Sequence, residues 1–429
     1  MRILLLNQHY YPDIAATAQL ATDWAEWFAE RGHSVTVLCG SGKYRIPHKG
    51  HLPDANQPLP SIQLHRGVRI VRVSVPDAPV AQPAHASRAD KARHLARRAA
   101  AYGQFLAKAA AKLTQLDRPD VVVALTTPPF VGALGLCAQR FHRAKLVLWV
   151  QDVYPDLLWA SGLLSKDAPF TRALAALARR LYQSADALIA LDEAMAARLV
   201  QAGADPAKLT VIDHVADTQE LKPTPRGHSR LKHSLGLRDE FVVCYSGNHG
   251  RGHDFDTVLS ALSEQARTPT EPPIHWLFVG DGDEKARFLA AVPEPLRKNV
   301  HALPPQARSE LSDVLAAADV GLISVKANME GLVAPSKLYG LLAAGRPIAY
   351  IGPSRGRIPA LFREMDLGVC VQQHDGPALL RGLRALQADP ARWQTIAETC
   401  RRLAQTRFDK RLLLIRHETL LRSLVQEPT

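Results

Sequence analysis

The segment from Glu330 to Pro347, EGLVAPSKLYGLLAAGRP, places a lysine where a helix favours an anion. Pro335 fits the start of a helix, because its missing N–H would have no partner there; Gly345 and Pro347 end the helix. Lys337 then falls in the first turn, where the helix dipole is positive and no acidic residue balances it. A phosphate bound at the helix start would account for Lys337. A buried helix whose lysine head reaches water is the alternative.

Short apolar runs alternate with helical patterns along the chain, which indicates parallel strands covered by helices. The runs stand at 3–6, 34–38, 69–75, 121–125, 146–150, 187–190 and 211–212, and again at 241–245, 276–279, 320–324 and 348–351. Glycine-rich loops follow strands at Gly247, at Gly280-Asp281-Gly282 and at Gly352. Because the loops at the carboxyl ends of parallel strands hold the ligand, we predict an α/β protein of two Rossmann-like halves with its site in these loops.

A polar stretch containing Pro223, Pro225 and Gly227 separates the two series and is typical of an interdomain linker. A chain of 429 residues is also too long for one ordinary core. We predict an N-terminal domain over 1–217, a linker over 218–234, a C-terminal domain over 235–407, and a helix over 408–429 that packs back on the N-terminal domain.

The loops disfavour a dehydrogenase, the most familiar function of a Rossmann-like fold. The first strand leads into NQHYYPDIAATAQL instead of GxGxxG, and the loop FVGDGDEK carries acidic residues where a pyrophosphate would approach. The five cysteines are scattered without a CxxC pair, which argues against a disulfide framework and against a zinc site. We therefore predict neither a bound dinucleotide nor a metal.

The composition limits where in the cell the protein can lie, and the net charge limits the class of its partners. No run reaches the roughly 18 apolar residues of a membrane span, and residues 1–6 become polar too soon for a signal peptide, so we expect a cytoplasmic protein. The formal charge of +12 calls for an anionic partner. Nucleic acid is not expected, because no signature of nucleic-acid binding accompanies the charge.

The segment 86–113 concentrates basic residues among alanines. They are Arg88, Lys91, Arg93, Arg97, Arg98, Lys108 and Lys112. As a helix this segment has a basic face beside a mildly apolar one, which is typical of a helix resting on anionic lipid. We predict contact with an anionic membrane surface; a solvated surface helix is the alternative.

Several motifs, in order along nearly the whole chain, resemble family-four glycosyltransferases of the GT-B fold, in particular bacterial polysaccharide enzymes of the WcaI and WbuB type. The motifs are NQHYYPDIAATAQLATDWAEWFAERGHSVTVL, WVQDVYPD, VIDHVADT, YSGNHGRGHDFDTVL, FVGDGDEK, LAAADVGLIS and APSKLYGLLAAGRP. The resemblance implies two Rossmann-like domains facing each other across a cleft, a nucleotide-sugar donor held by the C-terminal domain, and an acceptor held by the N-terminal domain.

The resemblance also implies which residues bind the donor. Without a metal or other cofactor, fixed cations and backbone donors must stabilise the departing diphosphate. Arg251 and Lys337 would supply the cations; an ordinary surface arginine is the alternative for Arg251. His253 stands at roughly the second basic position of the family, where a lysine is more usual. Glu330 matches the first glutamate of the family's pair and would contact the donor sugar; a solvent-exposed carboxylate of the loop is the alternative. The remaining residues implied to bind substrate are Gly247, Asn248, Pro305 beside the base, Pro335, Ser336 and Leu338.

One position departs from the family pattern. Gly340 stands where the second glutamate usually holds the ribose, so the ribose must be recognised elsewhere, and Glu284 is one candidate. The base and the donor sugar therefore stay open, although the habit of the family favours a UDP-sugar.

In the N-terminal half, the resemblance places Ile14-Ala15-Ala16-Thr17 where many relatives have glycines near the donor phosphates, which makes Ala16 and Thr17 candidate contacts. Asp152 would align the acceptor hydroxyl or stabilise the positive charge developing at the anomeric carbon; a helix cap or a buried structural aspartate is the alternative. Two roles stay open for His9 and Tyr10: they line the acceptor site, or they have a structural role.

The function that the resemblance implies is a retaining transfer of a sugar from a nucleotide sugar to a saccharide on a polyprenyl diphosphate. The basic segment 86–113 suits an acceptor at the inner face of the cytoplasmic membrane. A nucleotide-sugar 2-epimerase of the same architecture, and a nucleotide-sugar-binding protein without turnover, are the alternatives.

Overall fold

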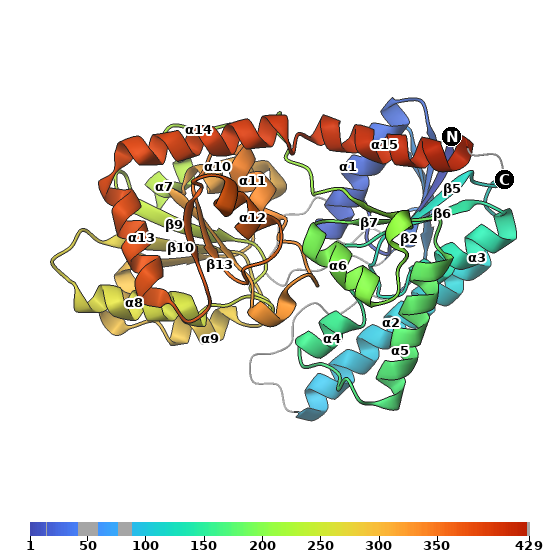
Figure 1. Ribbon diagram of the computed structural model, residues 1–429, viewed down its shortest axis with the longest axis horizontal. Helices are drawn as coiled ribbons and strands as arrows, with labels where there is room; N and C mark the ends of the chain where they lie inside the picture. The colour runs from blue at the N-terminus through green and yellow to red at the C-terminus, as the bar shows by residue number, and fades with distance from the viewer. Residues whose placement is uncertain (14, 42–58, 76–87, 427–429) are drawn as a thin grey trace. The chain divides into compact units, whose positions relative to one another are not determined.

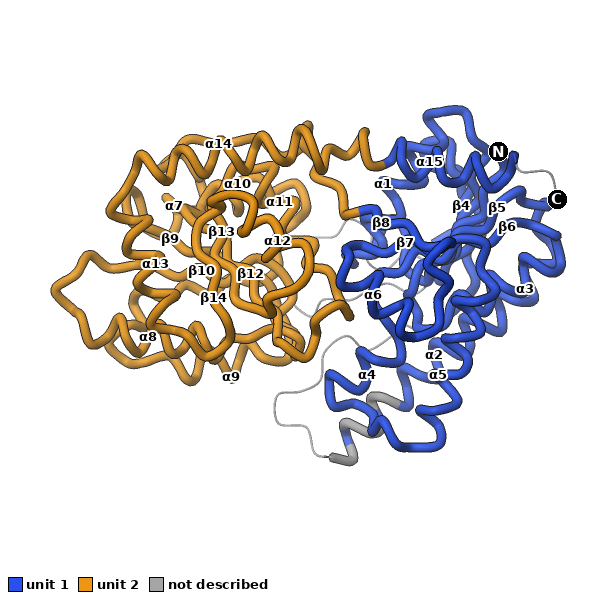
Figure 2. The backbone as a smooth tube through the Cα atoms, in the orientation of Figure 1, with its two compact units in different colours: residues 1–212, 414–429 blue, residues 213–413 orange. Residues whose placement is uncertain are grey.

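The computed structural model describes residues 1–13, 15–41, 59–75 and 88–426. The chain forms two compact units. Unit 1 contains residues 1–212 and 414–429, and unit 2 contains residues 213–413. Figure 2 colours the two units separately. Each has its own parallel sheet covered by helices, as the alternation of apolar runs and helical patterns predicts.

Unit 1 is built on a sheet with the strand order β3-β4-β2-β1-β5-β6-β7-β8. The strands are β1 (Arg2–Leu6), β2 (Ser34–Gly40), β3 (Ile62–His65), β4 (Val68–Val73), β5 (Val121–Ala124), β6 (Lys145–Trp149), β7 (Ala187–Ala190) and β8 (Leu209–Val211). The helices are α1 (Ala16–Glu30), α2 (Arg88–Leu113), α3 (Gly132–His142), α4 (Asp156–Ala160), α5 (Pro169–Ser184) and α6 (Glu193–Gln201). A 3₁₀ turn covers Pro206–Lys208.

The strand order of unit 1 explains which helices share a face. The chain moves from β1 to β2 in one direction through α1, and from β4 onward in the other direction through α2, α3 and α5. Right-handed crossovers then place α1 on one face and the other three on the opposite face, as Figure 1 shows. Among the described strands of unit 1, only β3 runs antiparallel to its neighbour, β4. The carboxyl ends of β1, β5 and β6 consequently meet at one edge of the sheet.

Unit 2 is built on a parallel sheet with the order β11-β10-β9-β12-β13-β14. The strands are β9 (Phe241–Ser246), β10 (Ile274–Val279), β11 (Val300–Leu303), β12 (Val320–Ser324), β13 (Ile348–Ile351) and β14 (Gly368–Val371). The helices are α7 (Arg230–Ser234), α8 (Asp256–Arg267), α9 (Lys285–Ala290), α10 (Leu311–Ala316), α11 (Lys337–Ala343), α12 (Arg357–Glu364), α13 (Gly376–Ala388) and α14 (Pro390–Thr406). Turns of 3₁₀ helix cover Glu294–Asn299, Arg308–Glu310 and Ala327–Met329.

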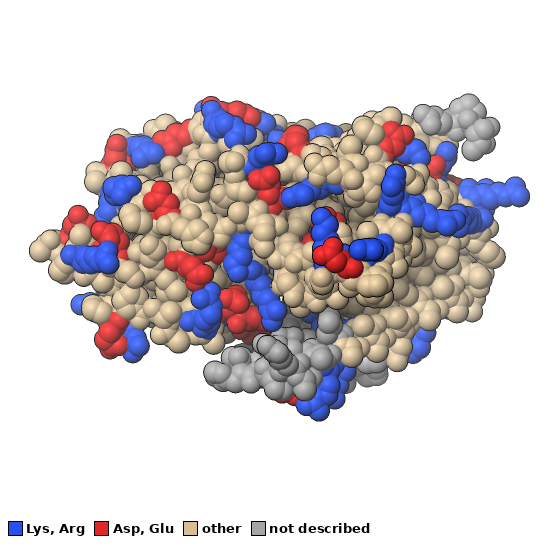
Figure 3. Space-filling model, turned by 60° about the horizontal axis from the view of Figure 1, so that its bottom comes forward, with Lys and Arg blue, Asp and Glu red and all other residues tan. Residues whose placement is uncertain are grey.

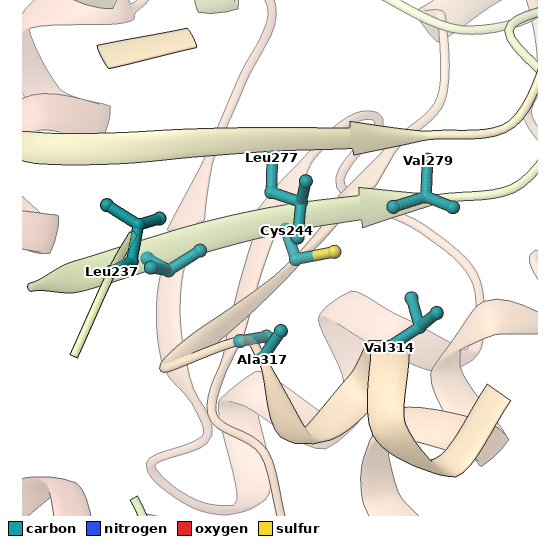
Figure 4. Packing of buried hydrophobic residues seen from close by; sticks show 8 residues of the cluster. Leu237, Cys244, Leu277, Val279, Val314 and Ala317 are labelled. Atoms are coloured by element: carbon teal, nitrogen blue, oxygen red, sulfur yellow. The ribbon is translucent and has the colours of Figure 1, made fainter. Parts of the chain in front are cut away.

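The core of unit 2 packs the sheet against its helices. In Figure 4, Cys244 of β9 and Leu277 and Val279 of β10 lie above Val314 and Ala317 at helix α10. All five are at most 3% exposed. Each large apolar side chain buried in this way contributes about 1.5–3 kcal/mol. This packing fixes the ends of β9 and β10, from which the glycine-rich loops emerge.

The segment predicted as a linker, 218–234, is packed into unit 2. Arg226 and Lys232 both pair with Asp319, at 2.6 Å and 3.1 Å. Lys232 and Asp319 are at most 2% exposed. The carboxylate of Asp319 also accepts from the backbone N–H of Val242, at 2.9 Å. This network ties the segment to the start of β9.

The helix predicted at the C-terminus is α15, Lys410–Gln426, and its residues from Leu414 onward belong to unit 1. His417 packs its ring against Trp149 and Trp24, with centroids 4.7 Å and 6.3 Å away. Glu418 accepts from His33 Nε2 at 2.9 Å. The helix thus covers the same face of the sheet as α1. No helix among the described residues is long and apolar enough to cross a membrane.

Candidate functional site

The loop after β9 passes close to Lys337 at the start of α11. The N–H of Gly247 donates to the carbonyl of Val279 at 2.9 Å, which ties this loop to the end of β10. Gly247 has φ 138°, and a Cβ there would lie 2.6 Å from Cε of Lys337. The positive φ favours glycine here, and any Cβ would force the lysine side chain to shift. The Nζ of Lys337 lies over the ring of Tyr245, 4.7 Å from its centroid.

Lys337 is a partly buried cation without a compensating carboxylate. No acidic side chain among the described residues lies within ion-pair distance of its Nζ, and Tyr245 supplies only a cation–π contact. Burial lowers the pKa of Lys337 from its ordinary value of 10.5 to about 8. Removing an ammonium from water without a partner is unfavourable. The position is therefore prepared for a ligand with negative charge.

Helix α11 begins later than the sequence predicts. Lys337 is its first residue and Ser336 its N-cap, so Pro335 precedes the helix. The N–H groups of Ser336 and Lys337 have no acceptor among the described residues, whereas the N–H of Leu338 donates to the carbonyl of Pro335 at 3.3 Å. The side chain of Leu338 is 1% exposed. Leu338 thus anchors the helix start, and the two residues before it present the N–H donors.

Two histidines, His249 and His253, are electrostatic neighbours of Lys337. His253 donates from Nδ1 to the carbonyl of Ser324, at 2.5 Å. Burial, and next the charge of Lys337, lower the pKa of His253 to about 3. His249 is fully buried, and neither ring nitrogen has a partner among the described residues. Burial lowers its pKa to about 4. Both imidazoles are neutral at physiological pH, so Lys337 carries the charge of this group.

The other residues predicted to contact the nucleotide sugar lie in loops of the same unit. Arg251 pairs with Asp283 of the loop after β10, at 3.6 Å from Nε to Oδ2. Glu330 lies 3.7 Å from Nε of Arg355. The first pair joins two loops at the carboxyl ends of neighbouring strands, and both pairs lie partly in solvent. Exchange of these partners for a ligand therefore costs little.

Asn248 is exposed, and its carbonyl accepts from the hydroxyl of Tyr245, which braces the loop. Pro305 follows β11 in the next loop.

Gly340 has surroundings that do not suit a ribose contact. A Cβ at this position would lie 3.7 Å from Cδ1 of Leu221 and equally close to Cδ1 of Leu315. A larger side chain at 340 would therefore begin in ordinary contact with two leucines. The alternative, Glu284, is paired with Arg287 at 2.8 Å.

In unit 1, the ends of β1, β5 and β6 are joined by hydrogen bonds. The N–H of Gln8 donates to the carbonyl of Thr127 at 2.9 Å. The hydroxyl oxygen of Thr126 accepts from the N–H groups of Gln151 and Asp152, each at 3.1 Å. These bonds hold the loops after three strands in one fixed arrangement.

Asp152 carries an unpaired carboxylate in this arrangement. Its side chain has no hydrogen-bond or ion-pair partner within the described parts of the chain, so the structure does not use it as a helix cap. Burial raises the pKa of Asp152 to about 6. A carboxylate held in this state is a common property of residues that act on a substrate.

The first loop of unit 1 contains a second titratable pair. His9 Nδ1 and Asp13 Oδ2 are 2.8 Å apart, and Asp13 also accepts from the N–H of Ala15 at 3.1 Å. This brings the loop to the start of α1, where Ala16 is the first helical residue and Thr17 follows. Ile14 lies outside the described residues. The structure thus groups the predicted residues into one set at the edge of each sheet.

Sequence reasoning missed several buried polar side chains near these edges, three of which are Gln8, Gln151 and His249. Gln8 and Gln151 are 3% and 6% exposed, and Gln8 Oε1 and Gln151 Nε2 lack partners in the described structure. His249 is the third. Their positions shortly after apolar strands could have indicated them, because a polar side chain buried there normally has a hydrogen-bond partner.

Comparisons with known proteins give a consistent result. Residues 16–213 match the family described as glycosyl transferase 4-like domain. The glycosyltransferase WbjE of Pseudomonas aeruginosa is 29% identical over 68% of this chain and 72% of its own length. The colanic acid biosynthesis glycosyl transferase WcaI of Escherichia coli K12 is 23% identical over 96% of this chain and 98% of its own.

Among solved structures, HepE from Anabaena in complex with UDP and glucose superposes with a TM-score of 0.68. The two chains share 18% identity, and the match covers 99% of this chain and 100% of HepE. At this identity the likeness concerns the fold, which includes both parallel-sheet units.

Proposed function

Because the chain belongs to the family-four-like bacterial glycosyltransferases and has their GT-B fold of two parallel-sheet domains, we propose that it moves a sugar from a nucleotide sugar to a lipid-linked saccharide. The proposed donor is a UDP-sugar. The proposed acceptor is a saccharide on a polyprenyl diphosphate, in the assembly of exopolysaccharide, O-antigen or capsule. The transfer retains the anomeric configuration and uses no metal or other cofactor.

The observation that carries the donor half of the proposal is Lys337. Its ammonium has no carboxylate within ion-pair distance in the described structure, and the N–H groups of Ser336 and Lys337 have no acceptor there. A diphosphate supplies both the charge and the acceptor oxygens that these groups lack. Two complexes of HepE, one with UDP and one with UDP-glucose, support a uridine nucleotide.

The proposed chemistry follows from the charge of the leaving group. As the bond to the anomeric carbon breaks, negative charge grows on the diphosphate, and fixed donors stabilise it without reorganisation. Lys337 and Arg251 supply this stabilisation in unit 2. Arg251 first releases Asp283, a partly solvated partner at 3.6 Å. The departing phosphate oxygen takes the acceptor proton, so that no dedicated base is required, and Glu330 orients the donor sugar.

Asp152 is the proposed acceptor-side group in unit 1. Its carboxylate is unpaired and partly buried at the carboxyl end of β6, beside Thr126. In that place it aligns the acceptor hydroxyl or stabilises positive charge at the anomeric carbon. Either role needs the ionised form, because a neutral acid neither accepts the hydroxyl proton as well nor balances a positive charge.

The membrane half of the proposal rests on α2. Arg93, Arg97 and Lys108 of this helix are exposed, and anionic lipid attracts each such residue by about 1 kcal/mol. On the face shown in Figure 3, Lys and Arg side chains lie among Asp and Glu side chains. We therefore propose peripheral association of α2 with the inner face of the cytoplasmic membrane. Retention on anionic but not on neutral vesicles at low salt is the expected result.

A panel of labelled UDP-sugars, incubated with and without lipid-linked saccharide, tests the function. Release of UDP that depends on the acceptor, together with label in the lipid fraction, is expected. Isomerised free donor would instead indicate a 2-epimerase, and binding without release would indicate a protein without turnover. Neither alternative is favoured by the relatives, which are named as transferases.

Matched variants test the site. Lys337→Met and Arg251→Ala are expected to weaken UDP binding by roughly tenfold or more, since each removes a hydrogen bond to a charged group. Arg267→Ala is the control, because Arg267 of α8 is exposed and, among the described residues, pairs only with Glu264 of its own helix. Equal UDP affinity in all three variants would refute the donor site.

A further inference from the structure

Thr126 joins two loops at the carboxyl edge of the sheet in unit 1. It lies just beyond β5, the strand between β1 and β6. Its hydroxyl oxygen accepts from the N–H groups of Gln151 and Asp152, which follow β6, each at 3.1 Å. Thr126 and Asp152 are both partly exposed. One hydroxyl oxygen therefore contacts the backbone of Asp152 and stays within reach of a ligand.

These two bonds restrict what the hydroxyl of Thr126 can do. A hydroxyl oxygen has two lone pairs and carries one proton. The N–H groups of Gln151 and Asp152 occupy both lone pairs, so the proton points away from them. No group within the described ranges accepts this proton. Thr126 can therefore act toward a ligand only as a hydrogen-bond donor, and the bonds that it accepts strengthen its donation.

The carboxylate of Asp152 has the opposite character. An ionised carboxylate carries no proton and only accepts hydrogen bonds, and no group in the described structure donates to it. The N–H of Asp152 lies 3.1 Å from Thr126 Oγ1. Because the side chain of aspartate is short, the carboxylate cannot lie far from the same oxygen. An acceptor without a donor is thus held near a donor without an acceptor.

Neighbouring hydrogen bonds fix both loops. The N–H of Gln8, after β1, donates to the carbonyl of Thr127 at 2.9 Å. The hydroxyl of Tyr182 in α5 donates to the carbonyl of Tyr154 at 3.1 Å. A donor and an acceptor that are held in this way select a ligand by its hydrogen-bonding groups, because neither can turn far to meet a different group.

The pair suits one kind of ligand group. A group that joins the two must donate to Asp152 and accept from Thr126. A sugar hydroxyl does both with a single oxygen. A carboxylate or a phosphate would be repelled by Asp152, and an ammonium has no lone pair to offer Thr126. The ligand group that fits is therefore a neutral hydroxyl.

We propose that Thr126 is a specificity-determining residue for the acceptor and donates to a sugar hydroxyl that in turn donates to Asp152. This inference rests on the proposed function. In the proposed transfer the reacting hydroxyl gives its proton to the departing phosphate, so the hydroxyl held by Asp152 is a different one. The acceptor sugar therefore carries a second free hydroxyl, which Thr126 and Asp152 bind to position the one that reacts.

Saturation-transfer NMR in the presence of UDP tests the site with the methyl glycosides of glucose, galactose, mannose, N-acetylglucosamine and rhamnose. The glycoside with the strongest transfer is titrated to obtain its Kd. Thr126→Val should raise this Kd by about fivefold to tenfold, the effect of one hydrogen bond. Thr126→Ser keeps the hydroxyl and should bind as the wild type does. Thr114→Val is the matched control, because Thr114 is exposed after α2 and its hydroxyl donates to the carbonyl of Ala111.

Thr126→Val also removes the acceptor of two backbone N–H groups, so its effect on the loops has to be separated from the lost bond to the ligand. Monodeoxy derivatives of the chosen glycoside make this separation. In the wild type, the derivative without the bound hydroxyl should bind about fivefold to tenfold more weakly than the parent glycoside. In Thr126→Val this difference should be clearly smaller, because one of the two bonds is already absent. A purely structural role would leave the difference unchanged.

Three results would overturn the inference: equal Kd values for Thr126→Val and Thr114→Val, an equal loss on deoxygenation in Thr126→Val and the wild type, or no binding of any glycoside. UDP release that depends on the lipid-linked acceptor reports separately on the proposed function. If release occurs but the two losses are additive, only the role of Thr126 is wrong. If the losses are not additive but release never occurs, the transfer is wrong and the sugar site stands.

Discussion

Replacing Lys337 by methionine should make the free protein more stable while it removes the proposed anion site. Burial lowers the pKa of this lysine from 10.5 to about 8, which corresponds to about 3 kcal/mol at 1.36 kcal/mol per pKa unit. Partial exposure reduces this figure, and the lost cation–π contact with Tyr245 offsets about 1 kcal/mol. A net gain of about 1–2 kcal/mol at pH 7 remains, with the stem of the side chain preserved.

The dependence on pH has a definite sign. Below pH 8 the lysine is protonated in both the folded and the unfolded chain, so the full cost of the buried charge is present. Between about pH 8 and 10.5 the folded form releases its proton first, and the cost disappears. The advantage of Lys337→Met should therefore be largest below pH 8 and vanish near pH 10.

Thermal denaturation followed by circular dichroism measures this effect. A domain of 150–250 residues shifts its Tm by about 2–4 °C per kcal/mol, so a rise of roughly 4 °C at pH 7 is expected without ligand. UDP should raise the Tm of the wild type by more than it raises that of the variant.

Lys285→Met is the contrasting control. The ammonium of Lys285 donates to the carbonyls of Gly280 and Leu303, each at 2.6 Å, so its loss should lower the Tm. An unchanged or lower Tm for Lys337→Met at pH 7, or a gain that persists at pH 10, would refute the reasoning.

Three further results are expected. Transfer should fall as the pH drops through about 6, where Asp152 takes up a proton, and Asp152→Asn should be slow at every pH without this acidic limb in its rate profile. Gly247→Ala should cost about 1–3 kcal/mol through strain at φ 138° and weaken UDP binding, as melting and titration would report; unchanged values would contradict the close approach to Lys337. Burial alone would raise the pKa of Glu418, but hydrogen bonds, the first from His33, lower it to about 2. Glu418→Gln should therefore cost about 2–3 kcal/mol at pH 7, and the difference in urea midpoints should shrink below pH 4.5; a constant difference would exclude this charge as its source.

The central strands of both sheets follow from the sequence because they are buried on both faces. A run such as 121–124 or 348–351 is apolar at every position, and such runs are typical of interior parallel strands. The strands that the pattern did not predict, β3, β11 and β14, stand at the edges of their sheets. Edge strands are only partly covered, so their side chains do not need to be uniformly apolar, and the periodic signal disappears.

Helices α13 and α14 were missed although each begins with a readable signal. Asp375 and Asp389 accept from N–H groups of the first turn, and a proline follows within the first two positions of each helix. These are ordinary start signals of a helix. Attention to caps as well as to apolar spacing would have found both elements.

Some residues of the site could be identified from the local sequence, whereas others depend on contacts between distant parts of the chain. Lys337 was identified because its conflict with the helix dipole is written in consecutive residues. The unpaired groups of Gln8, Gln151 and His249 could not be identified in this way. Whether a buried side chain has a hydrogen-bond partner depends on all the residues that pack around it, and these come from distant parts of the sequence. The approach of Gly247 to Lys337 joins positions 90 residues apart, and only the fold brings them together.

The return of α15 to unit 1 has a consequence for biosynthesis. A ribosome completes residues 1–212 long before it reaches His417, whose ring packs on Trp24 and Trp149. Until then His417 cannot pack on these tryptophans. The nascent unit is therefore incompletely packed and accessible to chaperones and proteases until the last segment of the chain has been synthesised. A fragment cut at the family boundary, residue 213, would repeat this unfinished state permanently. The N-terminal half should therefore be more stable when residues 414–426 are supplied, either fused or as a separate peptide.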